Sequence, residues 1–105
     1  MAIEYVIEKD SDGAWLFCPR IRCDHCRLVI EDANLANVYY DPGKADTGSP
    51  ALFAHKECDY AFSRSYPDVR LYWETLNVFL VHLGNNLKFE RKEAEKLSAT
   101  LSSIR

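Results

Sequence analysis

Two short stretches, Cys23-Asp24-His25-Cys26 and His55-Lys56-Glu57-Cys58, decide how this chain of 105 residues folds. Each stretch contains two metal-ligating side chains separated by two residues, and 28 residues lie between the two pairs. In a C-x2-C turn, both sulfurs can point at one ion while backbone N–H groups face them. At the start of a helix, positions i and i+3 share one face, and the helix dipole favours a thiolate there.

Zinc is the metal that suits this pattern, because it prefers four nitrogen and sulfur ligands arranged as a tetrahedron. We therefore predict one structural Zn²⁺, bound by Cys23, Cys26, His55 and Cys58. Four protein ligands leave no coordination position for a reactive water, so we do not expect an enzyme.

The remaining cysteine and two further histidines have alternative interpretations. Cys18 can replace one of the ligands or be oxidised, but its apolar neighbours at 15–17 favour a buried thiol in a strand. His25 is expected to face solvent from within the C-x2-C turn. His82 is expected on a helix surface or in packing rather than at a metal.

The order of these features resembles a treble-clef zinc finger. A C-x2-C pair, a β segment, and Phe53-Ala54-His55-Lys56-Glu57-Cys58 opening a helix are similar to the first half of a LIM domain. The resemblance covers residues 18–66 and implies ligand roles for the same four side chains. The chain differs from a LIM domain in its long loop between the pairs and in lacking a second zinc module.

Strand-forming residues and turn signals predict several short strands. Residues 3–7 and 14–17 flank the turn sequence at 10–13 and should form a hairpin, with Pro19 ending the second strand or marking an edge. Residues 28–30 and 38–40 are expected to pair with each other, and residues 51–54 form another strand.

The second half of the chain predicts three helices, at 55–65, 69–83 and 89–104. Strands followed by helices indicate an α+β fold. We expect a single domain over 1–105 that consists of a β-hairpin (1–17), a zinc finger (18–66) and a C-terminal helical pair (67–105).

Charge and apolar content limit the cellular setting. The formal net charge is −3, and the N-terminus lacks the basic and apolar regions of a signal peptide. No apolar stretch is long enough to span a membrane. We expect a cytoplasmic protein without membrane contact, in which cysteines serve as metal ligands rather than disulfides.

A protein-interaction or scaffold role is the function we expect. The predicted helix over 71–83 is apolar on nearly every side, so it must be buried on more than one face. Either the last helix covers it within one chain, or a protein partner does, including a second copy in a homodimer formed through the C-terminal helices. The candidate anchors are Tyr72, Trp73, Phe79 and Leu80, and the facing stripe is Ala94, Leu97, Leu101 and Ile104.

Two other functions compete with this one. A nucleic-acid-binding regulator is suggested by basic residues beside the C-x2-C turn and on the last helix, although the total charge is acidic and no continuous basic stripe is present. These residues are Arg20, Arg22, Arg27, Lys88, Arg91, Lys92 and Lys96. A C-x-x-C redox enzyme is a weaker alternative, because strand-forming residues follow the motif and the second ligand pair is left unexplained.

Overall fold

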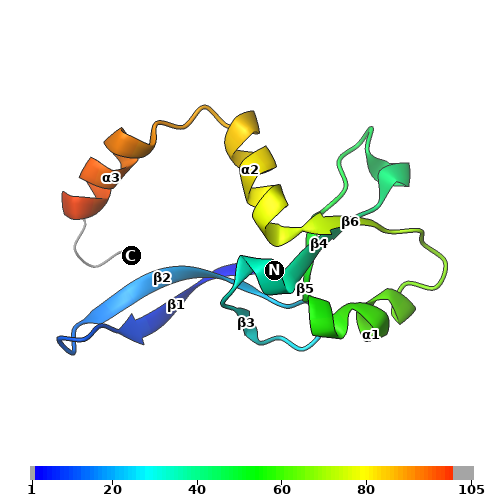
Figure 1. Ribbon diagram of the computed structural model, residues 1–105, viewed down its shortest axis with the longest axis horizontal. Coiled ribbons are helices and arrows are strands. Elements are labelled where there is room, and N and C mark those ends of the chain that lie inside the picture. The colour runs from blue at the N-terminus through cyan, green and yellow to red at the C-terminus, as the bar shows by residue number, and fades with distance from the viewer. Residues whose placement is uncertain (1, 101–105) are drawn as a thin grey trace.

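Two small antiparallel sheets and three α-helices make up the computed structural model, which describes residues 2–100 (Figure 1). Sheet A has the strand order β1-β2-β3, and sheet B has the order β5-β4-β6. The predicted α+β class is confirmed. The strands are β1 (Ile3–Lys9), β2 (Trp15–Arg22), β3 (Val29–Ile30), β4 (Ala36–Tyr40), β5 (Leu52–His55) and β6 (Tyr72–Thr75), and the helices are α1 (Asp59–Arg64), α2 (Leu76–Asn86) and α3 (Arg91–Thr100).

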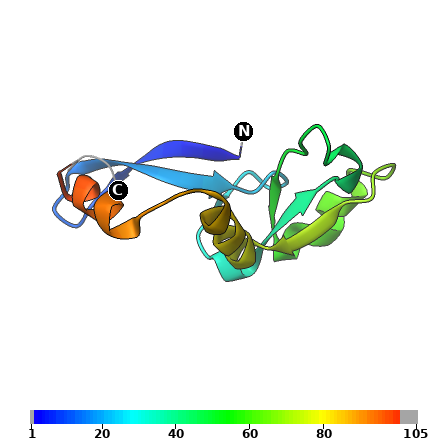
Figure 2. The same cartoon turned by 90° about the horizontal axis from the view of Figure 1, so that it is seen from above.

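The predicted hairpin is confirmed, and it is longer than expected. The Asp10 carboxylate closes the turn by accepting hydrogen bonds of 2.9 Å from the N–H groups of Asp12 and Ala14. Gly13 takes a φ of +83°, a left-handed conformation that glycine adopts at little cost. The hairpin extends away from sheet B, and α3 lies at the same end of the molecule as the hairpin turn (Figure 2).

Strand β2 continues through Pro19, where the sequence left open a strand end or an edge position. Pro19 pairs with Tyr5 of β1, whereas β3 pairs only with Ile21 and Arg22. Among the described residues, the β3 side of β2 therefore has no strand partner at Pro19. An edge position tolerates a residue without an N–H.

Helices α1 and α2 cover opposite faces of sheet B (Figure 1). Phe62 of α1 packs on Tyr39 with ring centroids 4.7 Å apart, and Phe79 of α2 meets Phe53 edge-on at 5.7 Å. Phe53 pairs with Val38, the neighbour of Tyr39, so the two aromatic contacts lie on opposite sides of the sheet. This packing forms the buried core around β4.

The expected pairing of 28–30 with 38–40 is wrong. Strand β3 pairs with β2 in sheet A, whereas β4 pairs with β5 and β6 in sheet B. A 3-10 turn at Ala33–Leu35 separates the two strands. The Asp32 carboxylate caps this turn by accepting a 2.8 Å hydrogen bond from the N–H of Asn34.

The expected helix over 69–83 is wrong in its first half. Residues Tyr72–Thr75 form strand β6 along the free edge of β4, and the helix runs only over Leu76–Asn86. Aromatic and β-branched residues favour a strand wherever a sheet edge can pair with them. A continuous apolar run does not by itself distinguish the two structures.

The other two expected helices begin later than predicted. His55 ends β5, a 3-10 turn covers Lys56–Cys58, and α1 begins only at Asp59. Helix α3 covers Arg91–Thr100, and the predicted residues 101–104 lie outside the described part of the chain. No helix of the described residues is long and apolar enough to cross a membrane.

Shortening Phe62 tests the packing of α1. Phe62 is 2 % exposed, so Phe62→Ala should lower the free energy of unfolding by about 3–5 kcal/mol, the usual cost of emptying an aromatic core position. Tyr60, two residues earlier in the same helix, is 74 % exposed, and Tyr60→Ala should change stability by about 0.5 kcal/mol or less. Urea denaturation of both variants measures the difference, and equal losses would contradict this packing.

Candidate metal centre

The structure brings together all four predicted ligands. The donor atoms of Cys23, Cys26, His55 and Cys58 all lie within 4.8 Å of one another. The Cys26 sulfur lies 3.3 Å from Nδ1 of His55. Bonds of about 2.0–2.3 Å to a tetrahedral zinc would separate the donors by roughly 3.5–4 Å, so this group of three thiols and one imidazole fits a zinc ion.

The four ligands come from both halves of the fold. Cys23 directly follows β2 and Cys26 lies in the turn before β3, so this pair belongs to sheet A. His55 is the last residue of β5 and Cys58 directly precedes α1, so the other pair belongs to sheet B and its helix. One ion bound here would join the two sheets.

The turn at Cys23 is shaped to present its sulfur to a cation. The N–H groups of His25 and Cys26 each lie 3.4 Å from the Cys23 sulfur and donate to it. The backbone of Cys23 also accepts from the N–H of Arg27 at 3.0 Å and donates to the carbonyl of Leu28 at 2.9 Å. Closing this turn gives Arg27 a φ of +68°, which is strained for a residue with a Cβ atom.

The local environment shifts the pKa values of Cys23 and Cys58 in opposite directions. Burial raises the pKa of Cys23, but hydrogen bonds from the backbone of Cys26, His55 and His25 outweigh it and lower the pKa to about 6. Burial together with the neighbouring Cys23 sulfur raises the pKa of Cys58 to about 12. Of these two thiols, Cys23 is therefore the one that ionises more readily. A divalent ion bound among the sulfurs would favour the thiolate of Cys58 against both burial and the neighbouring sulfur.

Asp24 supports the site in a way that the sequence analysis missed. Its N–H donates to the carbonyl of Phe53 at 2.6 Å, and its carboxylate accepts from the N–H of Phe53 at 2.8 Å. These two bonds fix the C-x2-C turn against β5, two residues before His55. The tendency of Asp to accept from nearby backbone N–H groups was the only signal in the sequence, and it does not indicate the partner.

Tyr39 and Asp59 form a second support that was missed. The Tyr39 hydroxyl donates to the Asp59 carboxylate, directly after Cys58 in the chain. Burial and the Asp59 carboxylate both raise the pKa of Tyr39, so the phenol stays protonated and acts as a donor. The bond holds the start of α1, and with it Cys58, against strand β4.

The three other candidates lie outside the group. Cys18 is a buried free thiol in β2, as expected, and His25 is exposed. His82 is exposed on α2, where its Nδ1 lies 2.7 Å from the Glu74 carboxylate. The expectations for these residues are confirmed.

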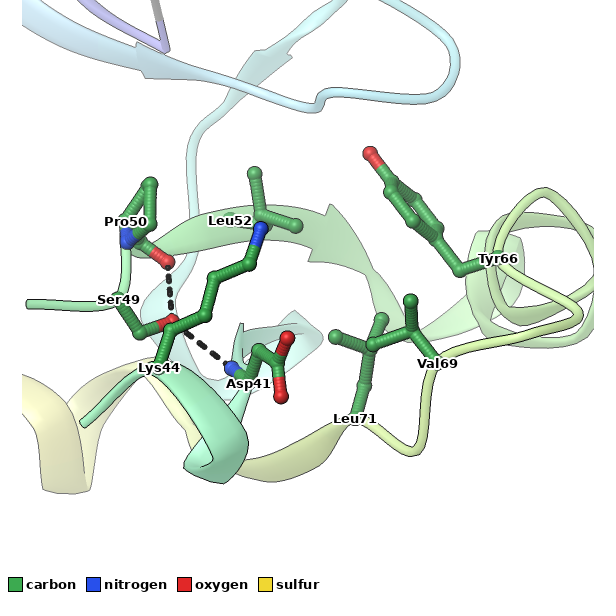
Figure 3. Close-up of a pocket in the computed structure, with 8 residues that line it drawn as sticks. All are labelled: Asp41, Lys44, Ser49, Pro50, Leu52, Tyr66, Val69 and Leu71. Carbon is green, nitrogen blue, oxygen red and sulfur yellow. Dashed lines mark hydrogen bonds between the residues drawn. The ribbon is translucent and has the colours of Figure 1, made fainter.

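A separate small hollow lies between the 41–50 loop, β5 and the segment after α1 (Figure 3). The Ser49 hydroxyl shapes the loop, because it accepts from the N–H of Asp41 at 2.8 Å and donates to the carbonyl of Pro50 at 3.3 Å. The volume of about 220 Å³ is below the roughly 300–1,000 Å³ of typical ligand pockets. This hollow is therefore a weaker candidate for a functional site than the metal-ligand group.

Comparison with known proteins adds no family assignment, since no protein-family model, curated protein or solved structure matches the chain.

The strained backbone of Arg27 gives the first test of the site. Arg27→Gly should keep the stability or raise it by up to about 1 kcal/mol, because glycine adopts this φ without strain. Arg27→Val should lower it by about 1 kcal/mol or more. Leu28→Gly, at the exposed neighbour without positive φ, should be destabilising, and chemical denaturation of the metal-loaded proteins measures all three. A loss in Arg27→Gly equal to that in Leu28→Gly would contradict the turn geometry.

Acidification gives the second test. The pKa of Cys23 lies below its ordinary value of 9.0, so the stabilisation from its thiolate is present at alkaline pH and is lost as the pH falls through about 6. Protons compete with a metal for the same thiolates. Zinc-loaded protein should keep its ion at pH 7 and release it with a midpoint below about 6, measured as zinc remaining after desalting at each pH. Release centred above pH 7 would contradict a stabilised thiolate site.

Proposed function

We propose that Cys23, Cys26, His55 and Cys58 bind one structural Zn²⁺ and that the domain they hold together is a protein-interaction module. The main support for this proposal is that four nitrogen and sulfur donors lie within 4.8 Å of one another. Four such ligands would fill a tetrahedral shell and leave no open position, which is the arrangement of structural rather than catalytic zinc. We therefore expect neither hydrolytic nor disulfide-reductase activity.

The positions of the two ligand pairs in the fold are the argument for proposing a treble-clef-like core. Its first ligand pair lies in a tight turn between two strands, and its second pair lies where a strand passes into a helix. A disulfide oxidoreductase would place its C-x-x-C motif at the start of a long helix, whereas here the strand β3 follows. The LIM-like ligand order remains part of this proposal.

Exposed apolar side chains on sheet B and α2 support the interaction role. Among the expected anchors, Trp73 is 60 % exposed and Leu80 is 47 % exposed, whereas Phe79 packs against Phe53. Tyr72, Val81 and Leu87 are exposed as well. Trp73 pairs with Tyr39, which packs on α1, so Trp73 lies on the face of sheet B opposite α2. Aromatic residues dominate the energetics of protein interfaces, so we propose the C-terminal surface, with one contact site at Trp73 and another on α2, as the region that binds a protein partner.

The stripe expected on the last helix contributes less to this proposal. Leu97 of α3 is 65 % exposed, and Ala94 is half-buried. Leu101 and Ile104 lie outside the described residues. Packing of two copies through the C-terminal helices therefore stays a prediction.

Charge pairing favours protein over nucleic acid as the partner. Arg20 forms two hydrogen bonds of 2.8 Å with Glu8, and Arg22 is paired with Glu4. On α3, Arg91 lies 2.7 Å from Glu95 and Lys96 lies 3.5 Å from Glu93. Cations that are already paired contribute less to the counterion release on which phosphate binding depends.

Zinc content tests the ligand set. Protein purified without added metal should contain close to one zinc per chain by elemental analysis, and Cys58→Ser should lose the ion or become insoluble. Cys18→Ser is the matched control, because Cys18 is equally a free cysteine but lies outside the ligand group. Full zinc in Cys58→Ser, or its loss in Cys18→Ser, would show that the ligands are misassigned. Separately, salt-dependent binding to duplex DNA or RNA would replace the protein-interaction role with the nucleic-acid one.

A further inference from the structure

One face of the β1–β2 hairpin is apolar from end to end. Paired residues of an antiparallel sheet share a face, so the register of the hairpin defines this set. We call it the hairpin face, and it consists of Ile3, Tyr5, Ile7, Lys9, Trp15, Phe17, Pro19 and Ile21. Lys9, beside the turn, is its one charged residue.

This face is exposed where an isolated domain would carry polar residues. Tyr5 and Trp15 are 66 % and 62 % exposed, and Ile3, Ile7 and Phe17 are 46–60 % exposed. The opposite face of the hairpin carries the ion pairs of Glu4 and Glu8 together with the buried Leu16 and Cys18. A sheet with one solvated face normally turns its polar side to water, so the hairpin has the reverse pattern.

An apolar pocket of about 610 Å³ lies at the base of the hairpin. Ile3 belongs both to the hairpin face and to the lining of this pocket, which also contains Phe53, Phe79 and Leu83. Asp24 is the one charged residue of the lining. The pocket is large enough for an aromatic side chain, since its volume is within the roughly 300–1,000 Å³ that accommodates drug-sized ligands.

The two ends of the hairpin are complementary to each other. At the turn, the Lys9 ammonium lies over the ring of Trp15, 4.8 Å from the ring centre. The base offers an apolar pocket with one carboxylate. Ile21 is six positions beyond Trp15 in β2, about 20 Å along the strand, so the aromatic end and the pocket of one chain cannot meet.

We propose that the hairpin faces of two copies pack together about a two-fold axis, antiparallel, so that Trp15 of each copy enters the base pocket of the other. Lys9 then approaches Asp24 of the other copy. This rests on the interaction role proposed above, but it assigns self-association to the hairpin and leaves the C-terminal surface for another protein. A two-fold contact of this kind uses the same patch on both copies and closes after two subunits.

The exposed area is sufficient for such a dimer. The three aromatic and two isoleucine side chains offer about 600 Å² per copy at their exposed fractions, on a scale of roughly 150–250 Å² for a fully buried aromatic residue. Two copies would bury about 1,200 Å², at the lower end of stable interfaces. The face has one cation and no anion, so it suits another apolar surface rather than nucleic acid.

Sedimentation of matched tryptophan variants tests the proposal. The intact protein should be a dimer at tens of micromolar, and Trp15→Ser should weaken it by about 30-fold or more, as for a hot-spot tryptophan. Trp73→Ser is the control, because Trp73 is equally exposed but lies on β6. Zinc content verifies that each variant is folded. A zinc-loaded monomer in the intact protein would overturn the dimer while leaving the interaction role intact, and a dimer lost only in Trp73→Ser would place the contact on the C-terminal elements.

The pocket is tested separately. The chain has two tryptophans, so in Trp73→Phe the fluorescence reports Trp15 alone, and its emission should shift to shorter wavelength as the protein concentration rises. Leu83→Arg should fill the pocket and abolish both the shift and the dimer. Val81→Arg, on the same helix but outside the lining, should preserve both. A dimer without any shift, or one that survives Leu83→Arg, would contradict entry of Trp15 into the pocket.

Discussion

The convergence of two ligand pairs on one point is the constraint on which the rest of the structure depends. Sheet A is a hairpin with a two-residue third strand, and sheet B has three strands of four or five residues. An isolated β-hairpin, such as the main part of sheet A, is marginally stable alone. A structural zinc contributes its binding free energy to folding, about 10–16 kcal/mol in zinc-finger peptides. An ion held by one pair from each sheet would therefore join sheet A to sheet B in a single folded unit.

The protein groups around the ligands serve the same junction. Asp24 ties the first pair to β5 through two hydrogen bonds with Phe53, and Tyr39 ties Asp59, next to the second pair, to β4. The buried aromatic contacts of Tyr39 and Phe53 then continue into α1 and α2. The metal site and the core are therefore one structure rather than a site placed on an independent scaffold. The core leaves apolar side chains exposed on the hairpin and on α2.

The ligand group was predictable because the spacing of Cys and His is a local property of the sequence, and so was the hairpin, whose turn residues have specific backbone preferences. The pairing of the strands beyond the hairpin was not predictable from the sequence. It depends on which strand edges are free to pair after the chain turns at Asp32. The apolar run over 71–83 fits a helix as well as a strand, and pairing with the free edge of β4 makes 72–75 a strand. Asp24 and Tyr39 were missed because their partners lie 29 and 20 residues away.

X-ray absorption at the zinc edge of the purified protein tests the central claim most directly, because it reports the atoms bound to the ion. A closed site formed by Cys23, Cys26, His55 and Cys58 predicts three sulfur atoms at about 2.3 Å and one nitrogen at about 2.0 Å. An oxygen in the shell would mean an open or catalytic position. Fewer than three sulfurs, or no bound zinc, would contradict the junction between the two sheets.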